Sequence, residues 1–218
     1  MAPADAKRVQ ISADGKQLMI ECSQQGGVIL LSAETGERLR SPAVLENAVA
    51  ATWDRNSADL AIHDPAIVCI DASGVLRVAD SKGVRDVAQV SGVSKVEQLS
   101  LFQEAWSEGN SPTRWIIAKS GKELVFSELE GERQVKLPLP NRTTSIEPSP
   151  VDGLLAIGGS GTVAIYFCAP SLDEPGRELF SLPGHAGSQI RTLHFSQDGS
   201  TLITTDASNR QQSWITLP

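Results

Sequence analysis

The sequence predicts an all-β protein built from about five repeats of an antiparallel meander, with four strands in each complete repeat. Apolar residues alternate with polar ones or cluster in runs of four to six, without the spacing of an amphipathic helix. The turn glycines Gly15 and Gly153 lie 138 residues apart, and Gly153 and Gly199 lie 46 apart, so the first interval is three times the second. A period in the forties indicates units that each form one small sheet.

The repeat with the clearest strand and turn signals extends from Leu182 to Trp214. Ile190 to Phe195 is a run of β-branched, aromatic and apolar residues, which favours a strand. Ser196 to Gly199 then predicts a tight turn, because glycine accepts a positive φ and aspartate can accept a hydrogen bond from its own backbone. A second strand is expected over Thr201 to Thr205, and a third strand ends at Trp214.

Three features of this repeat resemble a WD-repeat: the pair Gly184-His185, the turn from Phe195 to Gly199, and Trp214. The aspartate that follows the tryptophan in that family is replaced by Ile215. The resemblance implies a WD-like β-propeller of about five four-stranded antiparallel blades with an incomplete last blade, in which each blade buries its faces against its neighbours.

The repeats can be delimited along a single domain of residues 1–218. The first contains the same turn pattern at Ser12 to Gly15 and a fourth strand over Glu37 to Ser41. The second is irregular, because Ala58 to Pro65 is interpreted as an insertion between its first two strands. No helix of consequence is expected. The expected blades cover approximately residues 8–44, 48–91, 94–140, 142–183 and 189–218.

The last expected blade has only three strands, since Pro218 follows closely on the strand that ends at Trp214. In WD-repeat rings the missing strand normally comes from the opposite terminus, and neither Met1 to Lys7 nor the residues after Trp214 look suited to that role. Three arrangements remain open. They are a five-bladed ring with a three-stranded last blade, an open ring completed by strands of another polypeptide, and part of a larger propeller.

Charge and composition disfavour nucleic acid and membranes as partners. The chain has 26 acidic and 19 basic side chains, a net charge of −7, so no nucleic-acid partner is expected. No apolar run reaches the roughly 18 to 20 residues of a membrane span, and Met1 to Arg8 has no signal-peptide core, so a cytoplasmic protein is expected. Cys22, Cys69 and Cys168 lie in apolar runs and are expected to be buried, reduced thiols.

The sequence contains no pattern that assigns catalytic, metal-binding or cofactor-binding residues. No pair of His, Cys or carboxylate residues has the spacing of metal ligands. Gly158 to Gly161 looks like a phosphate-binding loop, but it precedes a strand rather than a helix, which favours a β-hairpin turn. No cofactor is therefore expected.

His185 is expected to be structural. In the WD-repeat family the corresponding histidine often joins a buried network with a serine or threonine, an aspartate and the tryptophan. The resemblance implies that Thr204 or Thr205 and Trp214 take two of these roles here, and Asn209 stands about where the aspartate would be. The expected polar cluster is therefore His185, Thr205, Asn209 and Trp214.

Three tryptophans are candidate partner contacts, because tryptophan is enriched at interface hot spots: Trp53, Trp106 and Trp115. Packing between blades is the alternative role for Trp115. The expected function is a non-catalytic protein–protein interaction scaffold that binds another protein through blade edges or upper-face loops, with partner strands completing the ring in one of the arrangements above. The alternatives are an enzyme or small-ligand binder that uses the central channel, and a regulatory or sensor domain of a larger multidomain protein.

Overall fold

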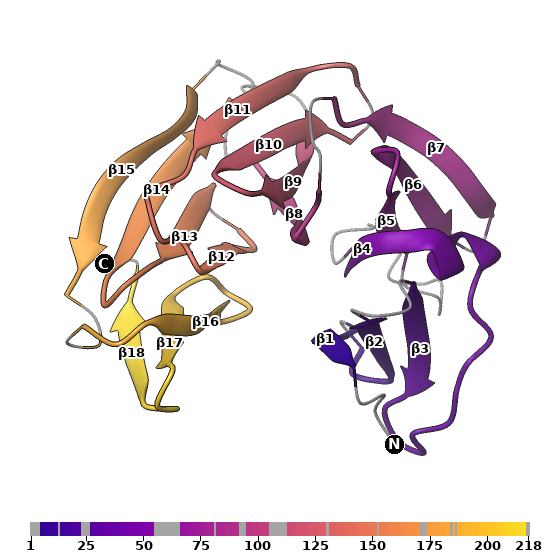
Figure 1. Ribbon diagram of the computed structural model, residues 1–218, viewed down its shortest axis with the longest axis horizontal. Helices are drawn as coiled ribbons and strands as arrows, with labels where there is room; N and C mark the ends of the chain where they lie inside the picture. The colour runs from indigo at the N-terminus through magenta and orange to yellow at the C-terminus, as the bar shows by residue number, and fades with distance from the viewer. Residues whose placement is uncertain are drawn as a thin grey trace. The chain divides into compact units, whose positions relative to one another are not determined.

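The computed structural model confirms the predicted all-β fold class. Its strands form five antiparallel sheets of three or four strands each (Figure 1). Among the described residues the one helical element is a short 3-10 helix, η1 (Ala43–Asn47), and no helix there is long and apolar enough to span a membrane. The structure describes residues 5–12, 14–22, 27–54, 66–80, 82–91, 95–104, 113–129, 131–151, 153–170, 174–183, 185 and 187–216.

The chain divides into two compact units. The first comprises Met1–Leu101, Ala118–Gly121 and Leu129–Glu132. The second comprises Phe102–Ile117, Lys122–Glu128 and Arg133–Pro218.

The first sheet contains β1 (Ala6–Ile11), β2 (Gln17–Cys22) and β3 (Val28–Ser32) in that order. The prediction of a fourth strand over Glu37 to Ser41 is wrong, because the chain there makes only an isolated bridge, between Arg38 and Leu31. The last backbone hydrogen bond of this segment to β3 runs from the Leu39 N–H to the Leu30 carbonyl at 2.8 Å, and the chain then enters η1, with Pro42 as its N-cap residue.

The second sheet contains β4 (Ala48–Trp53), β5 (Ile67–Asp71), β6 (Val75–Asp80) and β7 (Gly83–Gln89) in sequence order. The predicted insertion over Ala58 to Pro65 lies outside the described residues. The core of the first unit includes residues of both sheets and of η1: Met19, Val28, Leu30, Leu45, Ala48, Ala51, Trp53, Ile67 and Cys69.

The third sheet has the order β11-β10-β9-β8, and the fourth has the order β12-β13-β14-β15. The strands of the third sheet are β8 (Gln98–Gln103), β9 (Arg114–Ser120), β10 (Glu123–Glu128) and β11 (Gln134–Pro138). Those of the fourth are β12 (Ser145–Pro148), β13 (Leu154–Gly158), β14 (Val163–Ala169) and β15 (Glu174–Leu182).

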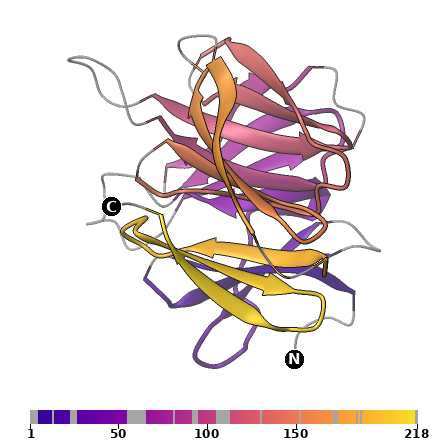
Figure 2. The same cartoon turned by 90° about the vertical axis from the view of Figure 1, so that its left-hand side faces the viewer.

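The fifth sheet has three strands, which are the yellow arrows in Figure 2: β16 (Ile190–Phe195), β17 (Thr201–Asp206) and β18 (Gln211–Ile215). It packs closely on the fourth sheet at Gly158, the last residue of β13, and Ile190, the first of β16. A Cβ added to Gly158 would lie only 2.8 Å from Cγ2 of Ile190. Gly158 therefore permits a contact that alanine would obstruct. The core between these sheets comprises Leu154, Ala156, Val163, Ile165, Ile190, Leu193, Phe195 and Leu202.

The predicted Ser-x-Asp-Gly turns are present at both ends of the chain. Ser12 donates to Asp14 at 2.6 Å and accepts from the Gln17 backbone at 2.9 Å. In the fifth sheet, Ser196 makes the same pair of bonds at 2.6 and 2.9 Å, to Asp198 and from Thr201. The glycines of both turns have positive φ, 73° and 72°. The recurrence of these turns therefore follows from local hydrogen bonding.

The cysteines are free thiols. Cys69 and Cys168 are buried, as expected, and Cys22 is half-buried. Burial raises the pKa of Cys69 to about 11 and that of Cys168 to about 12, so both are protonated and unreactive at neutral pH.

Candidate functional site

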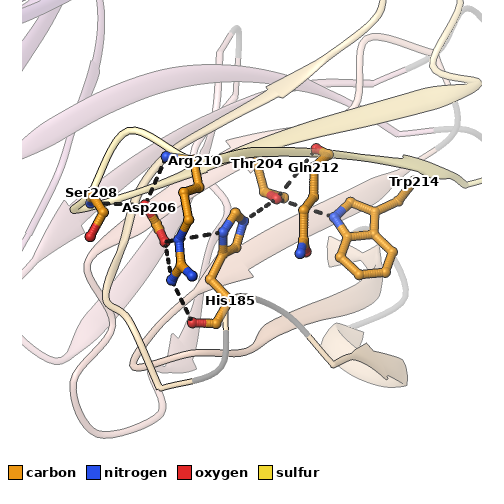
Figure 3. Close-up of polar contacts among 7 residues, drawn as sticks. All are labelled: His185, Thr204, Asp206, Ser208, Arg210, Gln212 and Trp214. Carbon is orange, nitrogen blue, oxygen red and sulfur yellow. Dashed lines mark hydrogen bonds and ion pairs between the residues drawn. The ribbon is translucent and has the colours of Figure 1, made fainter.

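A buried polar cluster lies in the fifth sheet (Figure 3). Nε2 of His185 lies 2.7 Å from Oγ1 of Thr204, and Nδ1 of His185 lies 3.4 Å from Oδ2 of Asp206. The indole N–H of Trp214 donates to the same Thr204 oxygen at 3.1 Å. We call His185, Thr204, Asp206 and Trp214 the His185 cluster.

Strand alternation decides which residues enter the cluster. Thr204 and Asp206 lie on the same face of β17 as Leu202, and Trp214 of β18 stands opposite Leu202. Thr205 projects from the other face of β17. The threonine of the cluster is therefore Thr204, and the predicted member Thr205 lies outside it.

The aspartate of the cluster is Asp206, not a substitute at Asn209. Oδ1 of Asp206 accepts from the backbone N–H groups of Ser208 at 2.8 Å and Arg210 at 2.9 Å, and Oδ2 accepts from Arg210 Nε at 2.7 Å. Asn209 is exposed, has a φ of 60°, and accepts a hydrogen bond from Arg191. Asn209 is therefore the left-handed residue of the turn that Asp206 holds together.

The hydrogen bonds on Asp206 fix its charge. Burial alone would raise the pKa of this carboxyl, but hydrogen bonds from the backbone and guanidinium of Arg210 and from the Ser208 backbone outweigh burial and lower the pKa to about 2. Ionised Asp206 faces Nδ1 of His185, which favours the ring tautomer that carries its proton on Nδ1. Nε2 shares a hydrogen bond with the Thr204 hydroxyl, and the same hydroxyl lies 3.4 Å from the Gln212 carbonyl. Every polar group of the cluster then has a partner, which stiffens the sheet.

The same turn occurs in the second sheet without the polar cluster. Oδ1 of Asp71, the last residue of β5, accepts from the backbone of Ser73 at 2.8 Å and of Val75 at 3.1 Å, and Oδ2 accepts from Arg77 at 2.5 Å. Hydrogen bonds from Ser73 and Arg77 outweigh burial and lower the pKa of Asp71 to about 2. Two residues before Asp71 stands Cys69, in an apolar core, where β17 has Thr204.

Sequence reasoning missed both aspartates, although a signal was present. The tripeptide Asp-Ala-Ser directly follows a strand pattern twice, at Asp71 to Ser73 and at Asp206 to Ser208. A downstream arginine accompanies each copy. The signal therefore identifies the turn between the second and third strands of a repeat.

The structure does not expose two of the three candidate tryptophans. Trp53 is 2% and Trp115 0% exposed, because the alternation of β4 and β9 directs both side chains into hydrophobic cores. The indole N–H of Trp115 donates to Oε2 of Glu104 at 3.1 Å. Neither side chain can contact a partner without unfolding, which corrects the expectation for both. Trp106 lies outside the described residues.

An exposed apolar edge lies instead on β15, the outer strand of the fourth sheet. Leu179 is 45% and Phe180 40% exposed. A β-bulge separates the pairs Ile165–Phe180 and Tyr166–Glu178, so Leu179 has no partner opposite it on β14. The described residues place no strand on the outer side of β15. We call residues 177–181 the β15 edge.

Glu21 is a buried carboxylate of the first unit that the sequence did not single out. Its Oε1 accepts from the Ala51 backbone at 3.0 Å, and its Oε2 has no hydrogen-bond partner among the described residues. Burial raises the pKa of Glu21, and the charge of Arg8 offsets this in part. Among the described residues, no group of three or more His, Cys, Asp or Glu side chains is placed to hold a metal ion.

Glu21→Gln is expected to raise the melting temperature at pH 7 more than at pH 4. The pKa of Glu21 is higher in the folded than in the unfolded chain. As the pH rises above the unfolded pKa, Glu21 ionises more readily in the unfolded chain, and the free energy of unfolding falls. Glutamine removes that loss at pH 7, and at pH 4 most of the loss is already absent. Thermal unfolding at both pH values measures the difference, with the exposed Glu34→Gln as control. A shift of equal size at both pH values would contradict the expected titration.

The comparisons with known proteins identify the fold. No protein-family model matches the chain, and no curated protein matches it in sequence. Among solved structures, the β-propeller domain of Cps50 (Swd1) from Myceliophteria thermophila superposes with a TM-score of 0.67 at 16% identity, over 100% of this chain and 67% of that one. KlHsv2 with its loop 6CD replaced by a Gly-Ser linker gives 0.63 at 12% identity, over 95% of this chain and 62% of that one.

A third solved structure, the computationally designed protein Ika8, gives a TM-score of 0.60 at 16% identity, over 96% of this chain and 58% of that one. Identities this low are informative about fold alone. The chain therefore has the β-propeller fold and spans about three fifths to two thirds of the length of these structures.

Proposed function

We propose that the chain is a non-catalytic protein-interaction module, a divergent WD-repeat β-propeller that binds a partner protein through an exposed blade edge. The β15 edge carries the proposal. An outer strand normally meets water with charged or polar side chains, because unpaired backbone groups beside apolar residues invite pairing with another chain. Between its polar residues Arg177, Glu178 and Ser181, the β15 edge exposes the apolar pair Leu179 and Phe180.

The chemistry of the edge fits an extended peptide of the partner. Such a strand would form main-chain hydrogen bonds with the outer side of β15, and its alternate side chains would cover Phe180. Two polar side chains of the edge, Glu178 and Ser181, are already paired: Glu178 accepts from Ser181 at 2.6 Å and from the Tyr166 hydroxyl at 3.4 Å. Docking would therefore bury apolar surface without having to order these side chains anew.

Membership in the WD-repeat family is part of the proposal. The His185 cluster supports it, because its residue types are those of the histidine, threonine, aspartate and tryptophan network of that family. His185 is buried and contacts Thr204 and Asp206, which favours a structural over a catalytic role for this residue. A cytoplasmic location completes the proposal.

The binding test uses the whole chain as bait in native extract, with Phe180→Lys as the variant and Val151→Lys, at an exposed turn position, as the matched control. We expect the wild-type and Val151→Lys baits to recover at least one protein in equal amounts. Phe180→Lys should recover about tenfold less of that protein, as expected for an interface hot spot. Equal recovery of every captured protein by the three baits would contradict the proposal.

A further inference from the structure

The β-bulge in β15 places Arg177 and Phe180 on the same face of the fourth sheet. Phe180 stands opposite Ile165 of β14, and Arg177 stands opposite Phe167. Residues two positions apart on a strand share a face, and both β14 side chains contact the core between the fourth and fifth sheets. Residues opposite each other on neighbouring strands also share a face. Phe180 and Arg177, both exposed, therefore give this face of the edge an aromatic ring and a guanidinium group.

The other polar side chains of the β15 edge lie on the opposite face. Glu178 stands opposite Tyr166, and Ser181 stands opposite Ala164. On that face Glu178 accepts hydrogen bonds from the hydroxyl groups of Ser181 and Tyr166. The carboxylate next to Arg177 in the sequence is therefore engaged on the other side of the sheet and does not neutralise the guanidinium group.

Arg177 differs from the basic residues of two other outer strands. Arg85 of β7 bonds to Asp80 at 2.5 Å, and Nζ of Lys136 of β11 lies 3.6 Å from Oε2 of Glu123. Among the described residues, the side chain of Arg177 makes no hydrogen bond or ion pair. An exposed cation without a partner, beside an exposed aromatic ring, complements a ligand that is both apolar and anionic.

We propose that the strand which docks on the β15 edge carries an acidic residue two positions from an apolar residue. This inference rests on the docking proposed for the edge and names the class of peptide that the edge takes. The apolar side chain covers Phe180, and the Asp or Glu carboxylate pairs with Arg177. The spacing follows from β14, on which the residues opposite Phe180 and Arg177 are also two positions apart.

The net charge of −7 does not oppose this pairing in physiological salt. Exposed charges more than about 8–10 Å apart are largely screened, so the cation at contact distance decides which charge is preferred. Water also weakens the contact with Arg177 itself, because an exposed ion pair contributes little affinity. We therefore expect the apolar contact at Phe180 to supply most of the affinity and Arg177 to supply selectivity.

Selection of displayed random peptides about ten residues long, on the purified whole chain, tests the proposal. Peptides that bind wild type but not Phe180→Lys are those that dock on the β15 edge. Most of these should contain Asp or Glu two positions from an aliphatic or aromatic residue. Circular dichroism and the melting temperature verify that Phe180→Lys is folded.

Exchange of charges on one selected peptide gives a sharper result. Arg177→Glu should weaken binding of the fluorescently labelled peptide about fivefold or more in anisotropy titrations, because repulsion replaces an exposed ion pair. The same peptide with Lys in place of its acidic residue should bind Arg177→Glu better than it binds wild type. The matched control is Arg191→Glu, at an exposed arginine in a bulge of β16, and it should bind the original peptide as wild type does.

Failure of this inference and failure of the proposed function give different results. Phe180-dependent peptides that lack the acidic residue, or that bind Arg177→Glu and wild type alike, would leave the docking edge standing and refute its acidic preference. Equal weakening by Arg191→Glu and Arg177→Glu would reduce the effect to overall charge and refute the assigned contact. If no peptide depended on Phe180, both the docking edge and the class of peptide would be wrong.

Discussion

Replacing Trp115 by alanine is expected to lower the free energy of unfolding by about 3–5 kcal/mol, because the side chain is fully buried and leaves a cavity. Trp115 lies in a core with Phe102, Phe126 and residues of the third and fourth sheets. For a chain of this length the loss corresponds to a fall in melting temperature of about 6–20 °C. Urea or thermal unfolding measures it.

Trp115→Phe separates packing from hydrogen bonding at the same position. Phenylalanine keeps an aromatic ring in the core but removes the N–H that donates to Glu104, whose carboxylate is buried. The expected loss is smaller, about 1–3 kcal/mol, because the buried Glu104 side chain loses this hydrogen bond. The exposed Val151→Ala serves as control. If Trp115→Ala unfolded within about 1 kcal/mol of wild type, the core described around it would be wrong.

Asp206→Asn is expected to cause a second large loss of stability, and this loss should depend on pH. An amide cannot accept the full set of bonds from Ser208, Arg210 and His185, and it removes the charge that pairs with Arg210. The melting temperature at pH 7 should fall by several degrees. Circular dichroism on heating measures it.

The pH dependence follows from the lowered pKa of Asp206. The folded pKa of about 2 lies below the reference value of 3.8, so the ionised carboxylate stabilises the fold above pH 3.8. This stabilisation is lost as the pH falls from about 4 toward 2, and the difference between wild type and Asp206→Asn should shrink over that range. Glu123→Gln, at an exposed position, is the control. A difference that stays constant down to pH 2 would contradict the assigned ionisation.

Sequence reasoning reached the fold because the signals of β structure are local. Runs of apolar residues and the turns at Gly15 and Gly199 are set by neighbours in sequence, and the structure has strands on both sides of each turn. Such features need no knowledge of the rest of the molecule. The fourth strand expected after Gly36 is reduced to one bridge at Arg38, because the chain leaves the sheet and enters η1.

The site was predictable only in part, because its geometry depends on register. Thr204 and Thr205 differ in the face they occupy, and that face is fixed only by the pairing of Leu202 with Trp214. From sequence alone, a tryptophan can be expected in a core or at an interface. The burial of Trp115 becomes evident only from the packing of the third and fourth sheets around it. The exposed β15 edge depends on a bulge, which apolar runs do not reveal.

The repeated Asp-Ala-Ser turn has a consequence for how the chain tolerates change. Asp71 and Asp206 each tie their own hairpin through backbone amides and an arginine, whether the interior beside them is apolar, as at Cys69, or polar, as at Thr204. Each turn is therefore stabilised by its own hydrogen bonds, and the interior residue two positions before the aspartate can vary without disrupting the turn. We expect that the interior residues of such a β-hairpin can be exchanged between blades by grafting, with the turn residues left unchanged.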